Sequence, residues 1–233
     1  IEYHEKKKAD ITLVCHDEEI DDSARYTAVK TDQDGRVSDI KINAKLSGKN
    51  KFYVNIMIMN RRFLINTIFD AVARGLNSFR RDILMRNFKS LKIFAYDFKG
   101  YHASIDSIGS YFKHNMELLN KNLRDELFGA RDIYTKVRDS APSKYGENSK
   151  IKNSLISDGC IVEGTVENSI LFRGVKVGKG SVIKNSIVMQ DNLIGDNVSL
   201  NCVITDKNVV IRDRRVLSGC EAQPYCIPKG SMI

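Results

Sequence analysis

Several kinds of residue and segment are scarce or absent in this chain of 233 residues. It contains no tryptophan, three prolines and four histidines, and every histidine precedes position 115. No apolar run approaches the roughly 20 residues that a membrane-spanning helix needs. The first ten residues, IEYHEKKKAD, lack the apolar core of a signal peptide and read as the end of a charged helix. We therefore expect the chain to be the C-terminal part of a longer protein.

Metal-binding and disulfide patterns are also missing. No two cysteines form a C-x-x-C pair, and the cysteines and histidines together lack the spacing of a metal site. The cysteines are Cys15, Cys160, Cys202, Cys220 and Cys226. We expect no metal site and reduced thiols, as in a cytoplasmic protein.

The chain is basic, with a formal net charge of +8 and a pI of about 9.2. Its basic residues are scattered, and no RNA-binding or helix-turn-helix signature accompanies them, so nucleic acid is not the expected partner. A solvated basic surface and a site for small phosphorylated ligands remain as two interpretations of the charge.

Residues 1–128 alternate predicted strands with predicted helices, which is typical of an α/β domain. Strands are predicted at 9–15 and 51–59, and two more within 25–43 joined through the Asp-Gly turn at Asp34 and Gly35. A further strand pair is predicted in KIFAYDF and YHASI. Residues 129–150 lose this periodicity, contain Pro142, and are predicted to be a linker.

Three helices are predicted in the same segment. They cover residues 60–75, about 78–87 with Ser78 as the N-cap, and 107–120. In the first of them an apolar stripe recurs at helical spacing, and we expect this stripe to pack in the core. Its members are Ile65, Ile68, Phe69 and Val72.

Residues 151–233 repeat a short unit about every 16 residues. KNSLI, ENSIL, KNSIV and LNCVI contain Asn153, Asn168, Asn185 and Asn201, and aliphatic residues recur between them every five or six positions. This period fits neither an α-helix nor a hairpin sheet, and it is typical of a hexapeptide β-helix. We expect the four asparagines to lie at one corner of successive coils. A β-sandwich of short strands is the alternative, but it would not repeat the same dipeptide in phase.

The combination of the two segments resembles the sugar-nucleotide pyrophosphorylases. The string IYTKVRDSAPSKYGENSKIKNSLISDGCIVEGTVENSILFRGVKVGKGSVI, residues 133–183, is similar to bacterial glucose-1-phosphate adenylyltransferases (ADP-glucose pyrophosphorylases), which supply ADP-glucose for glycogen. The resemblance covers essentially the whole chain. It implies an α/β, Rossmann-like nucleotidyltransferase segment over 1–128, the linker 129–150, and a left-handed parallel β-helix over 151–233.

Two strings of the catalytic family are altered in the first part of the chain. The family's Gly-rich nucleotide loop and its aspartate for the metal are not present in these 233 residues. A Glu-Lys-Pro string, whose Lys holds the sugar phosphate, aligns with Ile42, Asn43 and Ala44. A Ser-x-Gly string that approaches the sugar aligns with Tyr53 and Asn55.

A third string is altered near position 104. The family's Trp-x-Asp-x-Gly-Thr, whose Asp helps to bind magnesium, aligns with His102, Ser104, Asp106 and Ser107. Each change removes a charge or a close-approach glycine that nucleotidyl transfer needs. The resemblance therefore implies a non-catalytic, regulatory subunit beside a catalytic one. It implies a hetero-oligomer, a tetramer in the family's pattern, with no cofactor in this segment and Mg²⁺ only in the catalytic partner.

Other functions remain as alternatives. The chain could be part of an active glucose-1-phosphate adenylyltransferase whose essential residues lie in a missing N-terminal half. A hexapeptide acyltransferase needs a histidine base in the β-helix, and a γ-type carbonic anhydrase needs zinc-binding histidines there. His114 is the last histidine and precedes the repeats, which disfavours both.

A basic cluster follows the last clear repeat. Arg212, Arg214 and Arg215 lie in IRDRRVLSGC, and Lys229 follows in IPKGSMI. One interpretation is a charged edge that blocks further strand addition. The other is an effector anion site, since the family responds to phosphorylated sugars and arginine suits phosphate. Strand alternation would place Arg212 and Arg214 on one face and Arg215 on the other.

Overall fold

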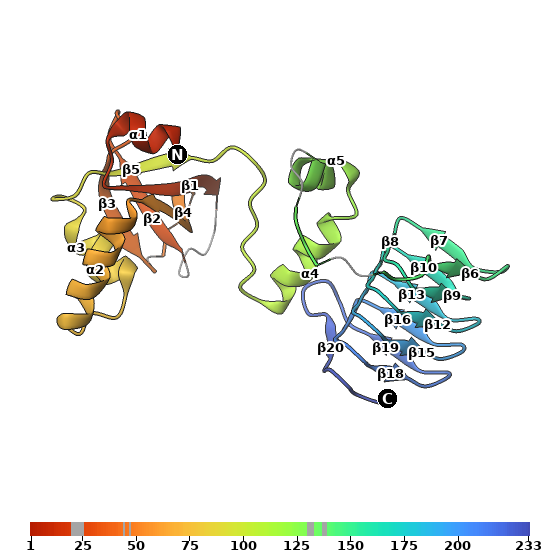
Figure 1. Ribbon diagram of the computed structural model, residues 1–233. Helices are drawn as coiled ribbons and strands as arrows, with labels where there is room; N and C mark the ends of the chain where they lie inside the picture. Colours follow the sequence, from red (N-terminus) through yellow and green to blue (C-terminus); the bar gives the residue numbers. More distant parts are fainter. Residues whose placement is uncertain (20–25, 44, 47, 130–132, 137–138) are drawn as a thin grey trace. The chain divides into compact units, whose positions relative to one another are not determined.

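The computed structural model describes residues 1–19, 26–43, 45–46, 48–129, 133–136 and 139–233, which divide into two compact units. The first unit is Ile1–His102 and the second is Ala103–Ile233 (Figure 1). Among the residues described, no helix is both long and apolar enough to cross a membrane.

The first unit is a mixed five-stranded sheet in the order β3-β2-β4-β1-β5. Its strands are β1 Ile11–Glu19, β2 Thr27–Thr31, β3 Val37–Ile42, β4 Lys49–Met59 and β5 Ile93–Asp97. The pair β1–β5 is parallel and the other pairs are antiparallel. The strands predicted at 9–15, 25–43 and 51–59 are therefore confirmed. The partner strand predicted in YHASI is wrong, because these residues form no strand.

The turn between β2 and β3 has the expected Asp-Gly chemistry. Asp32 Oδ1 accepts the backbone N–H groups of Asp34 and Arg36 at 3.0 and 2.9 Å, and Gly35 has a φ of 81°. A side chain at Gly35 would press against the hydroxyl of Tyr3. Tyr3 belongs to α1, Glu2–Lys7, and donates to the Ala95 carbonyl at 2.9 Å. The hairpin and α1 are thus held to β5.

Besides α1, the helices described in the first unit are α2 Arg61–Ala73, the π-helical segment η1 Phe79–Leu84, and α3 Met85–Asn87. Asn60 caps α2, and Ser78 caps η1 as predicted. The core beneath them contains Leu13, Ile40 and Leu84.

The expected burial of the α2 stripe is wrong. Phe63 packs against the sheet core, but Phe69 and Val72 are each 71% exposed and no residue of α2 is buried. Only one side of α2 packs against the sheet, and Phe63 lies on that side. The periodicity was correct for a helix but did not say which side meets the sheet.

The second unit is a parallel β-solenoid with three faces, each a stack of five strands. The β6 face is β6 Lys144–Tyr145, β9 Ile161–Val162, β12 Lys176–Val177, β15 Leu193–Ile194 and β18 Val210–Ile211. The β7 face is β7 Lys150–Lys152, β10 Thr165–Glu167, β13 Val182–Lys184, β16 Ser199–Asn201 and β19 Val216–Ser218. The β8 face is β8 Leu155–Ile156, β11 Ile170–Leu171, β14 Ile187–Val188, β17 Val203–Thr205 and β20 Tyr225–Ile227.

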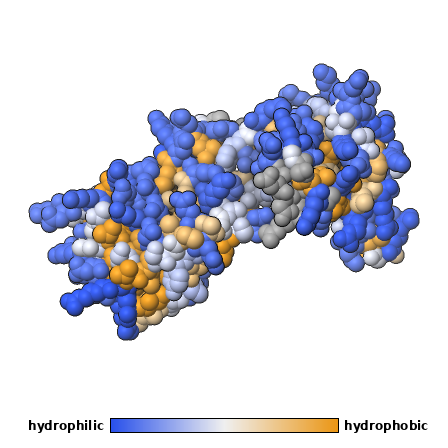
Figure 2. Space-filling model, turned by 180° about the vertical axis from the view of Figure 1, so that it is seen from behind, coloured by the Kyte–Doolittle hydropathy of each residue, from blue (hydrophilic) through white to orange (hydrophobic). Residues whose placement is uncertain are grey.

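Columns of like residues run through the solenoid, as the repeat predicts. Val166, Ile183 and Leu200 are register partners on the β7 face, and all three are inside the core. The first strand, β6, lies within residues 129–150, so the solenoid begins inside the segment predicted as a linker. Figure 2 shows that apolar residues also reach the outer surface among polar ones.

The corner between the β7 and β8 faces has the conformation that asparagine favours. Asn153, Asn168 and Asn185 have φ values of 44°, 46° and 45°, and Asn153 donates to Asn168 at 2.8 Å. The prediction is wrong for Asn201, which pairs with Lys184 inside strand β16. Cys202, with a φ of 51°, occupies the corner instead.

The serines that follow these asparagines connect the coils. The Oγ of Ser154 accepts the N–H of Ser169, and the Oγ of Ser169 accepts the N–H of Ser186, at 3.2 and 3.1 Å. Ser186 in turn accepts the N–H of Val203 at 3.1 Å. The repeated Asn-Ser pair is therefore a structural device of the corner.

The second unit also contains helices, and α4 covers part of the solenoid. They are α4 Ile108–Glu117, α5 Lys121–Arg124 and the π-helical segment η2 Asp125–Gly129. Phe112 of α4 is 3% exposed and packs against Ile187, Cys202 and Ile204. The residues after His102 thus lie in the second unit, whereas the sequence assigns everything to position 128 to the first domain. The difference arises because Ile187 and Ile204 lie on the outside of the β8 face, and Phe112 of α4 shields them from solvent.

Candidate functional site

The positions that align with the family's sugar-phosphate string end strand β3. Ile42 pairs with Thr27, and Asn43 has a left-handed φ of 53° with its N–H bonded to the Tyr26 carbonyl at 3.0 Å. Asn43 is exposed and carries no charge, so it cannot act as a phosphate-binding cation. Ala44 lies outside the described residues.

The positions that align with Ser-x-Gly lie in strand β4. Tyr53 is 4% exposed in the core, and burial raises the pKa of its phenol to about 12. Asn55 has a φ of 60° at an irregularity where the register between β1 and β4 shifts. The backbone at Asn55 therefore keeps a conformation that glycine adopts readily, while an amide side chain occupies the surface.

Ser104 and Asp106 belong to the second unit, whereas Asn43 and Asn55 belong to the first. Asp106 Oδ1 accepts a hydrogen bond from Ser110 Oγ at 3.1 Å, and Ser107 caps α4 in a capping box with Ser110. This stretch works as the start of a helix. No group of three metal-ligating side chains gathers anywhere in the described part of the chain.

A charged cluster that the sequence analysis missed lies across strands β4, β1 and β5. Lys51 Nζ is 3.1 Å from Asp17 Oδ1 and also contacts Asp97, and the Lys51 side chain is 16% exposed. Burial lowers the pKa of Lys51, but hydrogen bonds with Asp97 and Asp17 more than offset this and raise it overall. Lys51 and Asp17 are opposite each other in the pairing of β4 with β1. The sequence could have predicted their ion pair only if the register of these two strands were known. Lys51 is held by two carboxylates and is not available to a phosphate.

Beneath this cluster lies Cys15. Its thiol is fully buried, and burial raises its pKa to about 12. A neutral, inaccessible thiol is a poor nucleophile, so Cys15 is a packing residue.

A second charged column runs along the edge of the β7 face. Glu167 lies between Lys152 and Lys184, with both Nζ–Oε distances at 3.3 Å. Hydrogen bonds from the two lysines lower the pKa of Glu167. The column joins three successive coils.

The predicted effector residues lie in turns and not in a strand. Residues 212–215 connect β18 with β19, so the strand alternation expected for Arg212, Arg214 and Arg215 is wrong. Arg214 has a left-handed φ of 60°, and Arg212 contacts Met232 Sδ at 3.1 Å. Lys229 lies in a separate turn, and all four side chains are exposed. In the described residues none of them forms an ion pair.

A mainly apolar hollow of the second unit lies beside α4. It has a volume of about 710 Å³ and is lined by Phe112, Met116, Asn185 and Ala222 among others. It holds no basic cluster for a phosphate, since Lys113 is accompanied by Glu117 and Glu221.

Known proteins share both parts of the chain. A family model described as "GlmU-like, C-terminal hexapeptide" matches residues 139–223. The chain is 40% identical over 178 residues to the glycogen biosynthesis protein GlgD of Bacillus subtilis, covering 76% of this chain and 52% of that protein. It is 31% identical over 190 residues to a glucose-1-phosphate adenylyltransferase of Thermosipho africanus, covering 79% and 45%.

A third relative extends the match along the chain. The glucose-1-phosphate adenylyltransferase of Bacillus mycoides is 29% identical over 225 residues, or 93% of this chain and 59% of that protein. The chain thus spans about half the length of the curated relatives it matches. The mixed sheet, the hexapeptide solenoid and these similarities agree, and the chain belongs to the ADP-glucose pyrophosphorylase family.

Proposed function

We propose that this chain is part of a regulatory, catalytically inactive subunit of glucose-1-phosphate adenylyltransferase in glycogen biosynthesis. It acts with a catalytic partner that makes ADP-glucose from ATP and glucose 1-phosphate. The observation that carries the proposal is the state of the aligned positions in β3 and β4. The position of the phosphate-binding lysine is occupied by the uncharged Asn43, and Tyr53 directs its phenol into the core.

The chemistry of the reaction supports this reading. Nucleotidyl transfer depends on cations and metal ions that stabilise phosphate oxygens, and losing one such group costs on the order of 3 kcal/mol of transition-state stabilisation. Ser104 cannot replace a metal-binding aspartate, and the nearby Asp106 is engaged with Ser110. Lys51 on β4 is not free to act as a substitute cation, because it is bound by Asp17 and Asp97.

The retained fold supports a role in assembly. The core columns of the solenoid and the cover by α4 are intact, although the aligned catalytic positions have changed. Similarity to a glycogen biosynthesis protein and to adenylyltransferases favours a cytoplasmic hetero-oligomer, with four subunits as the family resemblance implies. Phosphorylated effectors would meet the exposed Arg212, Arg214, Arg215 and Lys229.

The test is an assay of ADP-glucose formation. The complete subunit is purified alone, and also together with the adenylyltransferase from the same organism. We expect no turnover by the subunit alone and altered kinetics for the pair. Turnover by the lone subunit at the rate of a catalytic enzyme would favour the alternative of an active enzyme.

The effector residues are tested in the mixed enzyme. Arg212→Ala and Arg214→Ala are each compared with Arg173→Ala, a change in an earlier coil. We expect the first two to weaken activation or inhibition by sugar phosphates and the third to leave both unchanged. Identical effector curves for all three variants would leave Arg212 and Arg214 as edge-capping residues only.

A further inference from the structure

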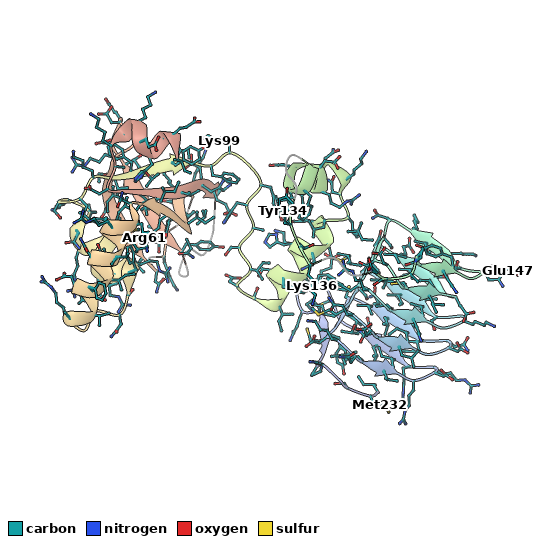
Figure 3. The ribbon with its side chains drawn as sticks, viewed as in Figure 1. Arg61, Lys99, Tyr134, Lys136, Glu147 and Met232 are labelled. Carbon is teal, nitrogen blue, oxygen red and sulfur yellow. The ribbon has the colours of Figure 1, made fainter. Side chains whose placement is uncertain are left out.

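Three of the five cysteines gather at one end of the solenoid. Cys202 occupies the corner between β16 and β17, Cys220 lies in the turn between β19 and β20, and Cys226 lies in β20. These strands belong to the last two coils, at the end where Met232 is labelled in Figure 3. All three cysteines are free thiols, and none of them has a role in the proposed function.

The turn between β19 and β20 is longer than its counterpart in the coil before. It runs from Gly219 to Pro224, whereas Cys202 alone joins β16 to β17. At its start, Gly219 donates its N–H to the Asn201 carbonyl at 2.9 Å, and a Cβ on Gly219 would lie 2.7 Å from the Cys202 carbonyl oxygen. At its end, Tyr225 donates its N–H to the Cys202 carbonyl at 3.0 Å. The turn therefore leaves and rejoins the stack against the backbone of Cys202.

The strand register selects Cys220 as the thiol beside Cys202. Continuing the pairing of β16 with β19 places Cys202 opposite Gly219, and a single step along the chain reaches Cys220. The diagonal between the Cα atoms of Cys202 and Cys220 is then roughly 6 Å, which a disulfide can span. Cys226 pairs with Ile204, two residues beyond Cys202, and that diagonal of about 8 Å is too long.

The two thiols differ in exposure, and this difference gives each of them a separate part in disulfide formation. Cys220 is exposed, whereas Cys202 is 5% exposed. Burial raises the pKa of Cys202, and negative charge on Glu221 and Cys220 raises it further. An oxidant in solution therefore meets Cys220 first, and Cys202 reacts afterwards with a sulfur that is already beside it.

We propose that Cys202 and Cys220 form a reversible disulfide that ties the turn 219–224 to the corner beneath α4. The oxidant is a small disulfide such as glutathione disulfide. The Cys220 thiolate attacks it, forms a mixed disulfide and releases one glutathione. The Cys202 thiolate then attacks the Cys220 sulfur, which closes the internal bond and releases the second glutathione. The two protons of the cysteine thiols end on the two glutathione thiols.

The bridge acts on the surroundings of α4. Cys202 packs against Phe112, and Glu221 and Ala222 of the turn line the hollow beside the same helix. A covalent bond from Cys202 to Cys220 fixes the turn against this corner, and reduction releases it. The redox state of two thiols thus sets how firmly one wall of the hollow is held. The bridge is independent of the proposed function, because every residue involved belongs to the second unit.

The test uses the complete subunit, including all residues that precede this chain, in buffers of set glutathione ratio. Free thiols are alkylated, and trypsin then separates residues 185–207, which contain Cys202, from residues 216–229, which contain Cys220 and Cys226. We expect mass spectrometry of the oxidised protein to find these two peptides joined, two hydrogens lighter than their sum. Dithiothreitol should separate them.

Two serine variants identify the partner of Cys202. Cys220→Ser should abolish the joined peptides, and the matched control Cys226→Ser should leave them unchanged. Because both thiols are exposed, both variants should melt with the wild type when reduced. Oxidation should raise the melting temperature of the wild type and of Cys226→Ser by about 5 °C or more, since a bridge restricts the unfolded chain, and should not change that of Cys220→Ser.

Three outcomes overturn the inference. The first is a wild type whose two peptides stay separate at every glutathione ratio. The second is glutathione that remains attached to Cys220 as a mixed disulfide. The third is a joined pair that persists in Cys220→Ser and disappears in Cys226→Ser, which identifies Cys226 as the partner. Each of these leaves the proposed function standing, because ADP-glucose formation is assayed on the reduced protein.

Discussion

Cys202 occupies in one coil the left-handed corner position that Asn185 occupies in the coil before it. Asn185 has a φ of 45° and Cys202 a φ of 51°, while Asn201 lies one step earlier in strand β16. The two residues differ in burial, because Cys202 is 5% exposed beneath Phe112 of α4. The corner thus changes from a polar ladder to an apolar contact where the helix covers it.

The corner conformation makes a prediction for Asn185. Asn185→Ala should lower the free energy of unfolding by about 1–2 kcal/mol, because alanine tolerates positive φ poorly and the bond to Asn201 at 3.0 Å is lost. Asn185→Gly loses the same bond without the backbone penalty. Urea unfolding of both variants gives the difference between their free energies of unfolding. If the glycine variant were no more stable than the alanine variant, the left-handed backbone at Asn185 would not be what favours asparagine there.

The charged cluster of the first unit makes a second prediction. Lys51→Met leaves Asp17 and Asp97 without their shared cation, and we expect it to cost about 1–2 kcal/mol, since both aspartates are partly exposed and screened by solvent. Lys49→Met, on an exposed position of the same strand, is the matched control. Denaturant midpoints at pH 7 provide the measurement, and equal midpoints for the two variants would show that the cluster adds no stability.

Glu167 makes the stability of the solenoid depend on pH. Its pKa in the folded protein is lowered from the ordinary 4.5, chiefly by the hydrogen bonds from Lys152 and Lys184. A lowered folded pKa means that the stabilisation is present above 4.5 and is lost as the pH falls through the folded value. Wild type should therefore melt above Glu167→Gln at pH 7, and the gap should close in acid. A gap that persists unchanged at pH 3 would refute this.

The thiols should react in two classes. Cys220 and Cys226 are exposed, whereas Cys15, Cys160 and Cys202 are buried. Burial raises the pKa of the three buried thiols and also that of Cys226, so exposure of the sulfur, and not its pKa, separates the two classes. A thiol reagent at pH 8 should modify two groups rapidly in the native protein and all five in denaturant. Rapid native modification of Cys15 would be inconsistent with the packing of β1.

The repeat and the hairpin were predictable because each depends on local chemistry. The turn at Gly35 and the corners at Asn153 and Asn168 have a left-handed backbone. Glycine and asparagine are the residue types that favour this conformation, so the sequence indicates it directly. The register of Asn201 was not predictable, because Asn201 and Cys202 are adjacent and only the pairing of Ile187 with Ile204 decides between them.

The features that the sequence did not reveal depend on contacts between distant segments. Lys51 and Asp97 are far apart in the chain and meet across β1. The periodicity of α2 identified a helix but could not choose the side that faces the sheet. Likewise, the residue types at Arg212–Arg215 do not distinguish a turn from a short strand. Strands and turns of only a few residues follow one another throughout the solenoid.

The coils also differ in length at the corner between the β6 and β7 faces. Between the β6 and β7 faces, the chain uses residues 146–149 in one coil, only Glu163 and Gly164 in the next, and 178–181 in the third. The short corner between two longer ones leaves a polar notch of about 430 Å³, lined by Glu147, Glu163 and Lys179 among others. Because the strands on either side keep their register, the stack absorbs a gain or loss of two residues at this corner without moving a core side chain. Changes in repeat length therefore alter the outline of this edge of the solenoid and leave its interior unchanged.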